Sequence, residues 1–142
     1  MAVSRNPATD RAPSSSPVIL VADDDPDARF IYSEYLRAMG CRVFTAVDGR
    51  VALAKAESLG PDAIVMDLAM PAVDGFEAIR RLRASSWTRW VPIIAISAVP
   101  MTQEDALRAG CDAYLAKPCD PEVLWLQIRS VLRIVDPGPQ RL

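Results

Sequence analysis

The chain has 142 residues, of which 51% are hydrophobic and 24% are charged, and its formal net charge is −2. This length fits one globular domain, and the near-neutral charge gives no indication of DNA binding through a basic surface. Because no apolar stretch approaches the roughly 20 residues that span a bilayer and no signal-peptide core is visible, we expect a cytoplasmic protein without membrane insertion.

Strand and helix signals alternate five times along the chain. Residues 1–17 are rich in proline and serine and are predicted to be a disordered extension, residues 18–135 form the predicted domain, and residues 136–142 a short flexible tail. The strands are predicted at 18–22, 42–46, 62–66, 91–96 and 113–116. The helices are predicted at 26–39, 49–58, 74–84, 102–109 and 120–135.

The first helix carries clear boundary signals. Asp25 is a predicted N-cap, Pro26 occupies the first helical position, and Gly40 ends the helix. One buried face is predicted to contain Ala28, Ile31, Tyr32, Tyr35, Leu36 and Met39. Strand–helix alternation and right-handed crossovers favour an α/β fold with a flavodoxin-like, doubly wound five-stranded parallel sheet, strand order 2-1-3-4-5, and five helices.

Acidic residues follow two of the predicted strands. Asp23, Asp24 and Asp25 come directly after the first strand, and Asp67 comes directly after the third. In a parallel sheet these strand ends meet at the edge where open α/β sheets bind ligands. Carboxylates that converge there repel one another unless a cation or protons intervene, and oxygen ligands suit a hard ion. The sequence therefore predicts a site for Mg²⁺ (or Mn²⁺).

Five short motifs occur in order, each at a strand end or in the loop that follows: VADD (21–24), MDLAMP (66–71), DG (74–75), ISA (96–98) and YLAKP (114–118). Together they resemble the receiver domain of the two-component response-regulator family, of the chemotaxis-type, single-domain kind. The resemblance covers about residues 18–134.

The resemblance implies a role for each acidic residue of the site. Asp67 matches the phosphoacceptor, a carboxylate nucleophile that forms an acyl phosphate and also contributes to the metal site. Asp24 matches the direct magnesium ligand, and Asp23 matches the neighbour that holds the metal through water. The backbone carbonyl of Ala69 would complete the protein's ligands. The alternative for the acidic run is a helix cap in a solvated loop, which we adopt only for Asp25.

Three further residues match the catalytic and switch positions of the family. Lys117 would reach the acceptor carboxylate and the phosphoryl oxygens, aimed inward by a cis bond to Pro118. Ser97 would donate a hydrogen bond to a phosphoryl oxygen, and Tyr114 would change rotamer as the loop responds. The alternatives are a surface lysine and a plain packing tyrosine.

The chain departs from the chemotaxis-type pattern in two places. The segment between Ser97 and Tyr114 is shorter and contains Val99-Pro100, so the loop is expected to move less. Ala69 and Val99 stand where many relatives carry polar groups that orient an attacking water, so a long-lived phosphoryl group is expected. The fourth helix is predicted to begin at Thr102, with a variant capping box.

Apolar residues outside these motifs suggest further contacts. The inward stripe of the last helix is predicted to contain Leu124, Ile128, Val131 and Val135. Trp125 and Leu126 fall off this stripe, so they either form a partner-binding patch or, for Trp125, pack against the fourth helix. Trp87 and Trp90 are predicted to be packing residues rather than a platform for stacked bases.

The leading interpretation is a stand-alone response regulator. It would take a phosphoryl group from a sensor histidine kinase or a histidine phosphotransfer protein, because this chain contains no histidine. It would then change the surface of its fourth helix, fifth strand and fifth helix to dock a downstream protein or pass the phosphate on, as a monomer or a phosphorylation-favoured dimer. It would catalyse only its own phosphorylation and dephosphorylation.

Three other functions fit the same fold less well. A phosphorylation-independent adaptor would not need an acidic pocket with a lysine and a hydroxyl. A flavodoxin-like mononucleotide binder requires a glycine- and hydroxyl-rich loop after the first strand, which is acidic here. In a magnesium-dependent phosphohydrolase the aspartyl nucleophile is usually the first residue of a DxD motif after the first strand, whereas here Asp23-Asp24-Asp25 precedes Pro26.

Overall fold

The computed structural model describes residues 16–71 and 73–133. The predicted tail and all but the last two residues of the predicted extension lie outside this part of the chain. The strands are β1 (Val18–Ala22), β2 (Arg42–Ala46), β3 (Ala63–Asp67), β4 (Ile93–Ser97) and β5 (Ala113–Ala116). The helices are α1 (Pro26–Ala38), α2 (Gly49–Leu59), α3 (Gly75–Ala84), α4 (Gln103–Ala109) and α5 (Pro121–Leu132).

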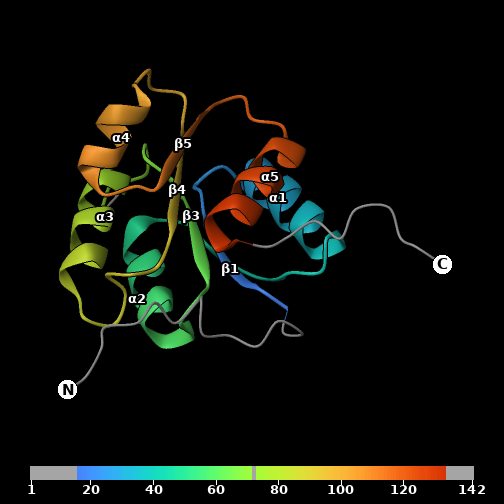
Figure 1. Ribbon diagram of the computed structural model, residues 1–142, viewed down its shortest axis with the longest axis horizontal. Coiled ribbons are helices and arrows are strands. Elements are labelled where there is room, and N and C mark those ends of the chain that lie inside the picture. The colour runs from blue at the N-terminus through green and yellow to red at the C-terminus, as the bar shows by residue number, and fades with distance from the viewer. Residues whose placement is uncertain (1–15, 72, 134–142) are drawn as a thin grey trace.

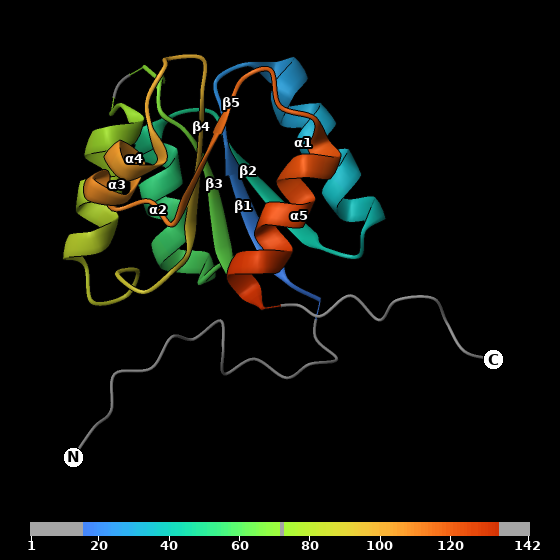
Figure 2. The ribbon, with the colours of Figure 1, turned by 45° about the horizontal axis from the view of Figure 1, so that its top comes forward.

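The five strands form one parallel sheet in the order β2-β1-β3-β4-β5, as predicted; Figure 1 labels four of them and Figure 2 all five. Every residue of β1, β3 and β4 is buried, because these inner strands are covered on both faces. In the register, Asp67 pairs with Ile96, and Ser97 pairs with Ala116. The carboxyl ends of β3, β4 and β5 therefore reach the same edge of the sheet.

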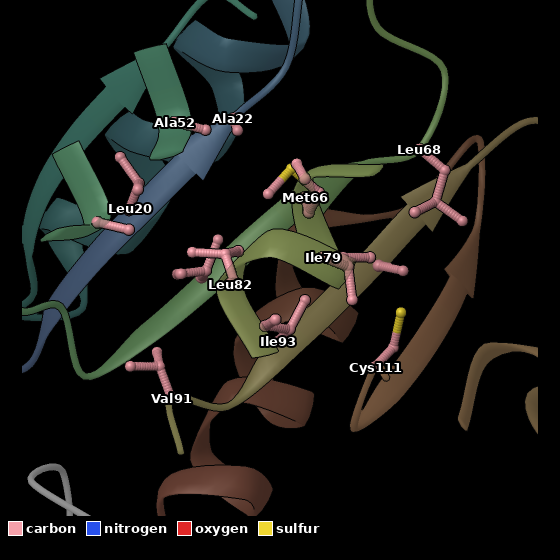
Figure 3. Close-up of a cluster of buried hydrophobic side chains, with 14 of the residues drawn as sticks. Leu20, Ala22, Ala52, Met66, Leu68, Ile79, Leu82, Val91, Ile93 and Cys111 are labelled. Carbon is pink, nitrogen blue, oxygen red and sulfur yellow. The ribbon is translucent and has the colours of Figure 1, made fainter. Parts of the chain in front are cut away.

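Helices cover both faces of the sheet (Figure 2). Helices α1 and α5 lie side by side on one face, and α2, α3 and α4 cover the other. In the core under α3, Leu20, Met66 and Ile93 of the strands lie close to Ile79 and Leu82 of that helix (Figure 3). These five side chains are at most 1% exposed, so the scaffold behind the strand ends is close-packed.

Two element boundaries differ from those predicted by more than one residue, and the other differences are of a single residue. β4 begins at Ile93 rather than at residue 91, because Pro92 has no N–H to donate to a strand ladder. α5 ends at Leu132 rather than at residue 135, because Arg133 adopts a left-handed conformation with φ of 57° and its N–H donates to the carbonyl of Ser130. Val135, predicted for the inward stripe, lies outside the described residues.

The predicted buried face of α1 is too wide. Tyr32 and Leu36 are buried in the cluster that α1 shares with the sheet and α5. Ile31 and Met39, in contrast, are 50% and 42% exposed. Helical spacing identifies the apolar positions, but the neighbouring sheet and helix cover only the centre of that stripe.

Candidate functional site

Three carboxylates meet where β1 and β3 end. Asp23 follows β1, and its N–H donates to the carbonyl of Ala46 at 3.1 Å, while Asp67 is the last residue of β3. Asp23 and Asp67 are 2% and 5% exposed, whereas Asp24 is open to solvent. One oxygen from each of Asp23, Asp24 and Asp67 lies within 4.8 Å of the other two. Because all three donors are carboxylate oxygens, the cluster suits a hard divalent cation such as magnesium.

Lys117 joins two of these carboxylates. Its Nζ donates to Oδ2 of Asp23 and to Oδ2 of Asp67, each at 3.0 Å. The bond between Lys117 and Pro118 is cis, as the resemblance implied, and the N–H of Lys117 donates to the carbonyl of Ser97 at 2.9 Å. The surface-lysine alternative is therefore wrong, because this ammonium lies inside the acidic pocket.

Burial and charge act in opposite directions on the pocket's pKa values. Burial raises the pKa of Asp23, the adjacent Asp67 adds to this effect, and hydrogen bonds from the Asp25 N–H and Lys117 oppose it. Burial alone would lower the pKa of Lys117, but the hydrogen bonds to Asp23 and Asp67 outweigh it and raise that pKa. Lys117 therefore stays protonated, with its charge directed at both carboxylates.

Backbone groups fix the orientation of both buried carboxylates. Oδ1 of Asp67 accepts from the N–H of Ala69 at 3.0 Å, and Oδ1 of Asp23 accepts from the N–H of Asp25 at 2.9 Å. Asp25 itself caps α1 by accepting from the N–H of Asp27, which confirms its predicted capping role. Each carboxylate therefore keeps its second oxygen on the Lys117 side of the pocket.

Sequence reasoning missed a further positioning residue, Arg29 on α1. Its Nη1 donates to the backbone carbonyl of Asp23 at 2.8 Å, which ties the acidic loop to the first turns of the helix. An arginine six residues beyond an aspartate has no motif of its own. The contact becomes evident only once the direction of α1 is known.

The DG motif explains how α3 can begin so close to Asp67. Asp74 caps α3 by accepting from the N–H of Glu77 at 2.9 Å. A Cβ at Gly75 would lie 2.4 Å from the Cα of Leu68 and 2.6 Å from the carbonyl oxygen of Asp67. Only glycine allows this approach, so the motif sets the position of α3 against the end of β3.

The proposed switch residues lie on the next two strands of the sheet, Ser97 at the end of β4 and Tyr114 in β5. Ser97 is fully buried, and its Oγ accepts from the N–H of Val99 at 3.0 Å. The Tyr114 hydroxyl donates to the carbonyl of Val99 at 2.9 Å, and its ring is buried. At the other end of the same loop, Thr102 and Asp105 form the predicted capping box of α4. The loop from β4 to α4 is therefore held at both ends.

The residues predicted outside the pocket differ in exposure. Trp125 is partly buried against the cluster between the sheet and helices α1 and α5, a cluster that contains no residue of α4. Leu126 beside it is 54% exposed. Trp87 and Trp90 are 77% and 47% exposed, so the prediction that they are packing residues is wrong for Trp87 and only partly right for Trp90.

With this geometry in place, comparison with known proteins decides the family. The family model for the response regulator receiver domain matches residues 19–129. The chain belongs to this family. No helix in the described part of the chain has the length and apolar character needed to cross a membrane.

Similar proteins include transcriptional regulators and isolated receiver domains. The DNA-binding dual master transcriptional regulator RpaA of Synechocystis sp. is 39% identical over 126 residues, which cover 87% of this chain and 52% of that protein. The chain thus spans about half the length of this relative. Chemotaxis protein CheY4 of Vibrio cholerae superposes with a TM-score of 0.77 at 32% identity, covering 82% of this chain and 99% of that one.

A second similar structure holds a metal. The receiver domain of sensor histidine kinase PA1611 from Pseudomonas aeruginosa is 36% identical, with a TM-score of 0.76, over 84% of this chain and 99% of that one. It has a magnesium ion coordinated in its active site cleft. The carboxylate cluster of the present chain offers oxygen ligands, which suit magnesium, at the edge of its own sheet.

Proposed function

We propose that this chain accepts a phosphoryl group on Asp67 from a phosphohistidine of a partner protein. The observation that supports this most directly is the placement of Lys117, whose Nζ lies 3.0 Å from both Asp23 and Asp67 while Asp24 completes the acidic cluster. An ionised carboxylate with one oxygen fixed by a backbone N–H is a positioned nucleophile.

The transfer follows from the groups present. An Asp67 oxygen attacks phosphorus, the P–N bond to the partner's imidazole breaks, and the imidazole keeps the bonding electron pair. A magnesium ion held by Asp23, Asp24 and Asp67, with the Ala69 carbonyl as the further predicted ligand, would stabilise negative charge on the phosphoryl oxygens. The Lys117 ammonium, which lies 3.0 Å from Oδ2 of Asp67, would donate to a phosphoryl oxygen.

The Ser97 hydroxyl and Tyr114 would then carry the signal. Ser97 Oγ, which accepts from the Val99 N–H, still has its own hydrogen to donate to a phosphoryl oxygen. A shift of Ser97 would move Val99, to which the Tyr114 hydroxyl is bonded. Phosphorylation would in this way bias the position of the loop and of α4, which is a population shift between two arrangements.

A labelling experiment tests this function. Acetyl phosphate with Mg²⁺ should label the wild type, and the label should be lost with Asp67→Asn and with chelator. Asp48→Asn is the matched control, because Asp48 caps α2 at the same sheet edge and lies outside the carboxylate cluster; it should label normally. A label that survives Asp67→Asn would overturn the proposal, and a complete lack of label would favour the adaptor alternative.

An open groove beside Lys117 suits the partner that supplies the phosphoryl group. The groove has a volume of about 480 Å³ and lies between the start of α1 and the segment after β5, with Ile31, Pro118 and Cys119 in its lining. Ile31→Lys should slow transfer from a phosphohistidine protein and leave labelling by acetyl phosphate unchanged. Equal slowing with both donors would show that the groove does not receive the partner.

The proposed function also requires an output surface that binds a downstream protein. We place the output surface on α4, β5 and α5, with Leu126 and the edge of Trp125 as contact residues. The net charge of −2 supports contact between the receiver domain and proteins rather than DNA. We expect this contact to take place in the cytoplasm. A pull-down with beryllofluoride-treated protein and with Asp67→Asn tests this, because the output partner should differ between them. Gel filtration of the present protein with and without beryllofluoride tests dimerisation. An immunoblot of its source cells gives the size of the natural protein and so tests whether the receiver domain is stand-alone.

A further inference from the structure

Two tryptophans project from the end of the molecule that is opposite the acidic pocket. Trp87 and Trp90 belong to the connection between α3 and β4, at the bottom of Figure 2, whereas the connections after β4 and β5 are at the top. They are 77% and 47% exposed. The guanidinium of Arg89 lies 5.5 Å from the ring centroid of Trp90, so a cation is held against this indole.

Several hydrogen bonds fix the turn that carries these side chains. Thr88 is 1% exposed, and its hydroxyl donates to the carbonyl of Leu82 at 2.7 Å. Nη1 of Arg83 donates to the carbonyls of Arg89 and Val91 at 3.0 and 2.7 Å. The indoles are therefore exposed because an ordered turn holds them outward, and binding through them requires little ordering of the backbone.

The charge of this surface comes from one residue. Arg83 is engaged inside the fold, where Nη2 donates to Asp112 at 2.9 Å and Nε donates to the carbonyl of Gly110. Arg89, by contrast, has no carboxylate within ion-pairing distance in the described part of the chain. Its positive charge is available to a binding partner, and an acidic group would be its complement.

The composition of the surface favours a protein partner. Tryptophan and arginine are the residues most enriched among those that dominate protein–protein binding energy. Anionic membranes are bound by clusters of about four to eight basic residues, and nucleic acids by several phosphate contacts, whereas this surface offers one free cation. We infer that Trp87, Arg89 and Trp90 form a docking surface for a protein segment that carries a carboxylate flanked by apolar side chains.

This surface goes beyond the proposed phosphoryl transfer, because it lies at the amino ends of the strands and Asp67 lies at the carboxyl ends. No side chain of the turn contributes to the acidic pocket. Docking here should therefore be the same in the phosphorylated and unphosphorylated states. A partner could therefore stay bound at this end while Asp67 at the opposite end is phosphorylated and dephosphorylated.

Fluorine NMR offers a direct test, because the chain contains only three tryptophans and Trp125 on α5 serves as an internal reference. Short random peptides on phage are selected on the wild type after counter-selection on the Trp87→Ser/Trp90→Ser variant. Selected peptides should combine Asp or Glu with apolar residues. A synthetic copy should shift the 5-fluorotryptophan signals of Trp87 and Trp90 and leave Trp125 unchanged.

A charge variant separates specific docking from general stickiness. Arg89→Gln should weaken the peptide about tenfold. Arg50→Gln, an exposed arginine at the start of α2, should bind as the wild type does. Beryllofluoride should not change the affinity, and Trp87→Ser should still label at Asp67, so failure of this proposal is distinct from failure of the phosphoacceptor proposal.

Several outcomes would overturn the inference. Selection could yield no binder, or binders without acidic residues, or binders that shift Trp125 alone. Phosphatidylglycerol vesicles or an oligo-dT strand that shift Trp87 and Trp90 where the peptides do not would assign the surface to lipid or nucleic acid. Signals that shift with protein concentration alone would assign it to a second copy of this chain.

Discussion

The side chain of Gln103 satisfies both backbone groups of Tyr114. Gln103 Nε2 donates to the Tyr114 carbonyl at 2.6 Å, and the Tyr114 N–H donates to Gln103 Oε1 at 3.2 Å. β5 is one of the two edge strands of the sheet, so on its outer side these groups have no neighbouring strand to pair with. The amide of Gln103 takes the place of that strand and connects the first residue of α4 to the tyrosine of the proposed switch.

Replacing Gln103 by leucine should lower the free energy of unfolding by about 1–3 kcal/mol, because two polar groups of a buried residue lose their partners. Gln103→Glu should fall between the wild type and the leucine variant, since it keeps an acceptor for the Tyr114 N–H. Urea unfolding measures the difference. The control is Glu104→Ala, which removes only an exposed pair with Arg108 and should change little. Equal effects at 103 and 104 would show that the Gln103 bonds are unimportant.

Asp23→Asn and Asp24→Asn should each leave the metal-free protein as stable as the wild type or more stable. Asp23→Asn removes a buried charge whose pKa is raised by burial, and Lys117 keeps its bond to Asp67. Asp24→Asn removes an exposed charge that repels its neighbours. Wild type should gain in melting temperature with Mg²⁺, and both variants should lose most of that gain. Melting curves with and without Mg²⁺ decide this, and an unchanged gain in Asp24→Asn would contradict its role as a ligand.

The lifetime of the phosphoryl group should depend on position 69. Ala69 is exposed two residues after Asp67, and Val99, in the loop after β4, likewise has an apolar side chain. Ala69→Asn supplies an amide that can orient an attacking water, so dephosphorylation should accelerate about tenfold. Decay of the acid-labile label measures this, with Ala69→Val as the control of similar size. Equal decay in all three proteins would remove the idea that the missing polar groups prolong the acyl phosphate.

Alkaline pH should destabilise the protein through two buried thiols. Burial raises the pKa of Cys41 and of Cys111 from 9.0 to about 11, with small contributions from nearby charges. The folded state therefore holds these protons more tightly than the unfolded state, so the stability they contribute is complete below pH 9.0 and is lost as the pH rises towards 11. The loss is on the order of 2 kcal/mol per thiol. Urea unfolding of the wild type and of Cys41→Ala/Cys111→Ala at about pH 8 and about pH 11 tests this; parallel losses in both proteins would contradict it.

The fold was predictable because its signals are local. Five-residue apolar runs mark the inner strands, and the caps at Asp25 and Thr102 define helix starts through side chains only two or three residues away from the groups they bind. The strand order then follows from connection rules that hold for most parallel sheets. The grouping of Asp23, Asp24 and Asp67 follows as well, since it depends only on which strand ends share an edge.

The contacts that could not be predicted from the sequence depend on how separate elements approach one another in the fold. The bond from Arg29 to the Asp23 carbonyl and the pairing of Gln103 with Tyr114 join a side chain to a backbone, and no periodic pattern records such contacts. The exposure of Ile31 and Trp87 was missed for a related reason. Hydrophobicity shows that a side chain can be buried, but not whether a neighbouring element covers it.

The equal distances from Lys117 to its two carboxylates bear on how the pocket tolerates the loss of its metal. Three carboxylates and one ammonium leave two uncompensated negative charges, which is the charge that one divalent ion neutralises. In the metal-free state the Lys117 ammonium serves as an internal counterion that reduces the repulsion between the two buried carboxylates. Under the proposed function, the fold would persist without metal in a form that accepts no phosphoryl group until a divalent cation binds.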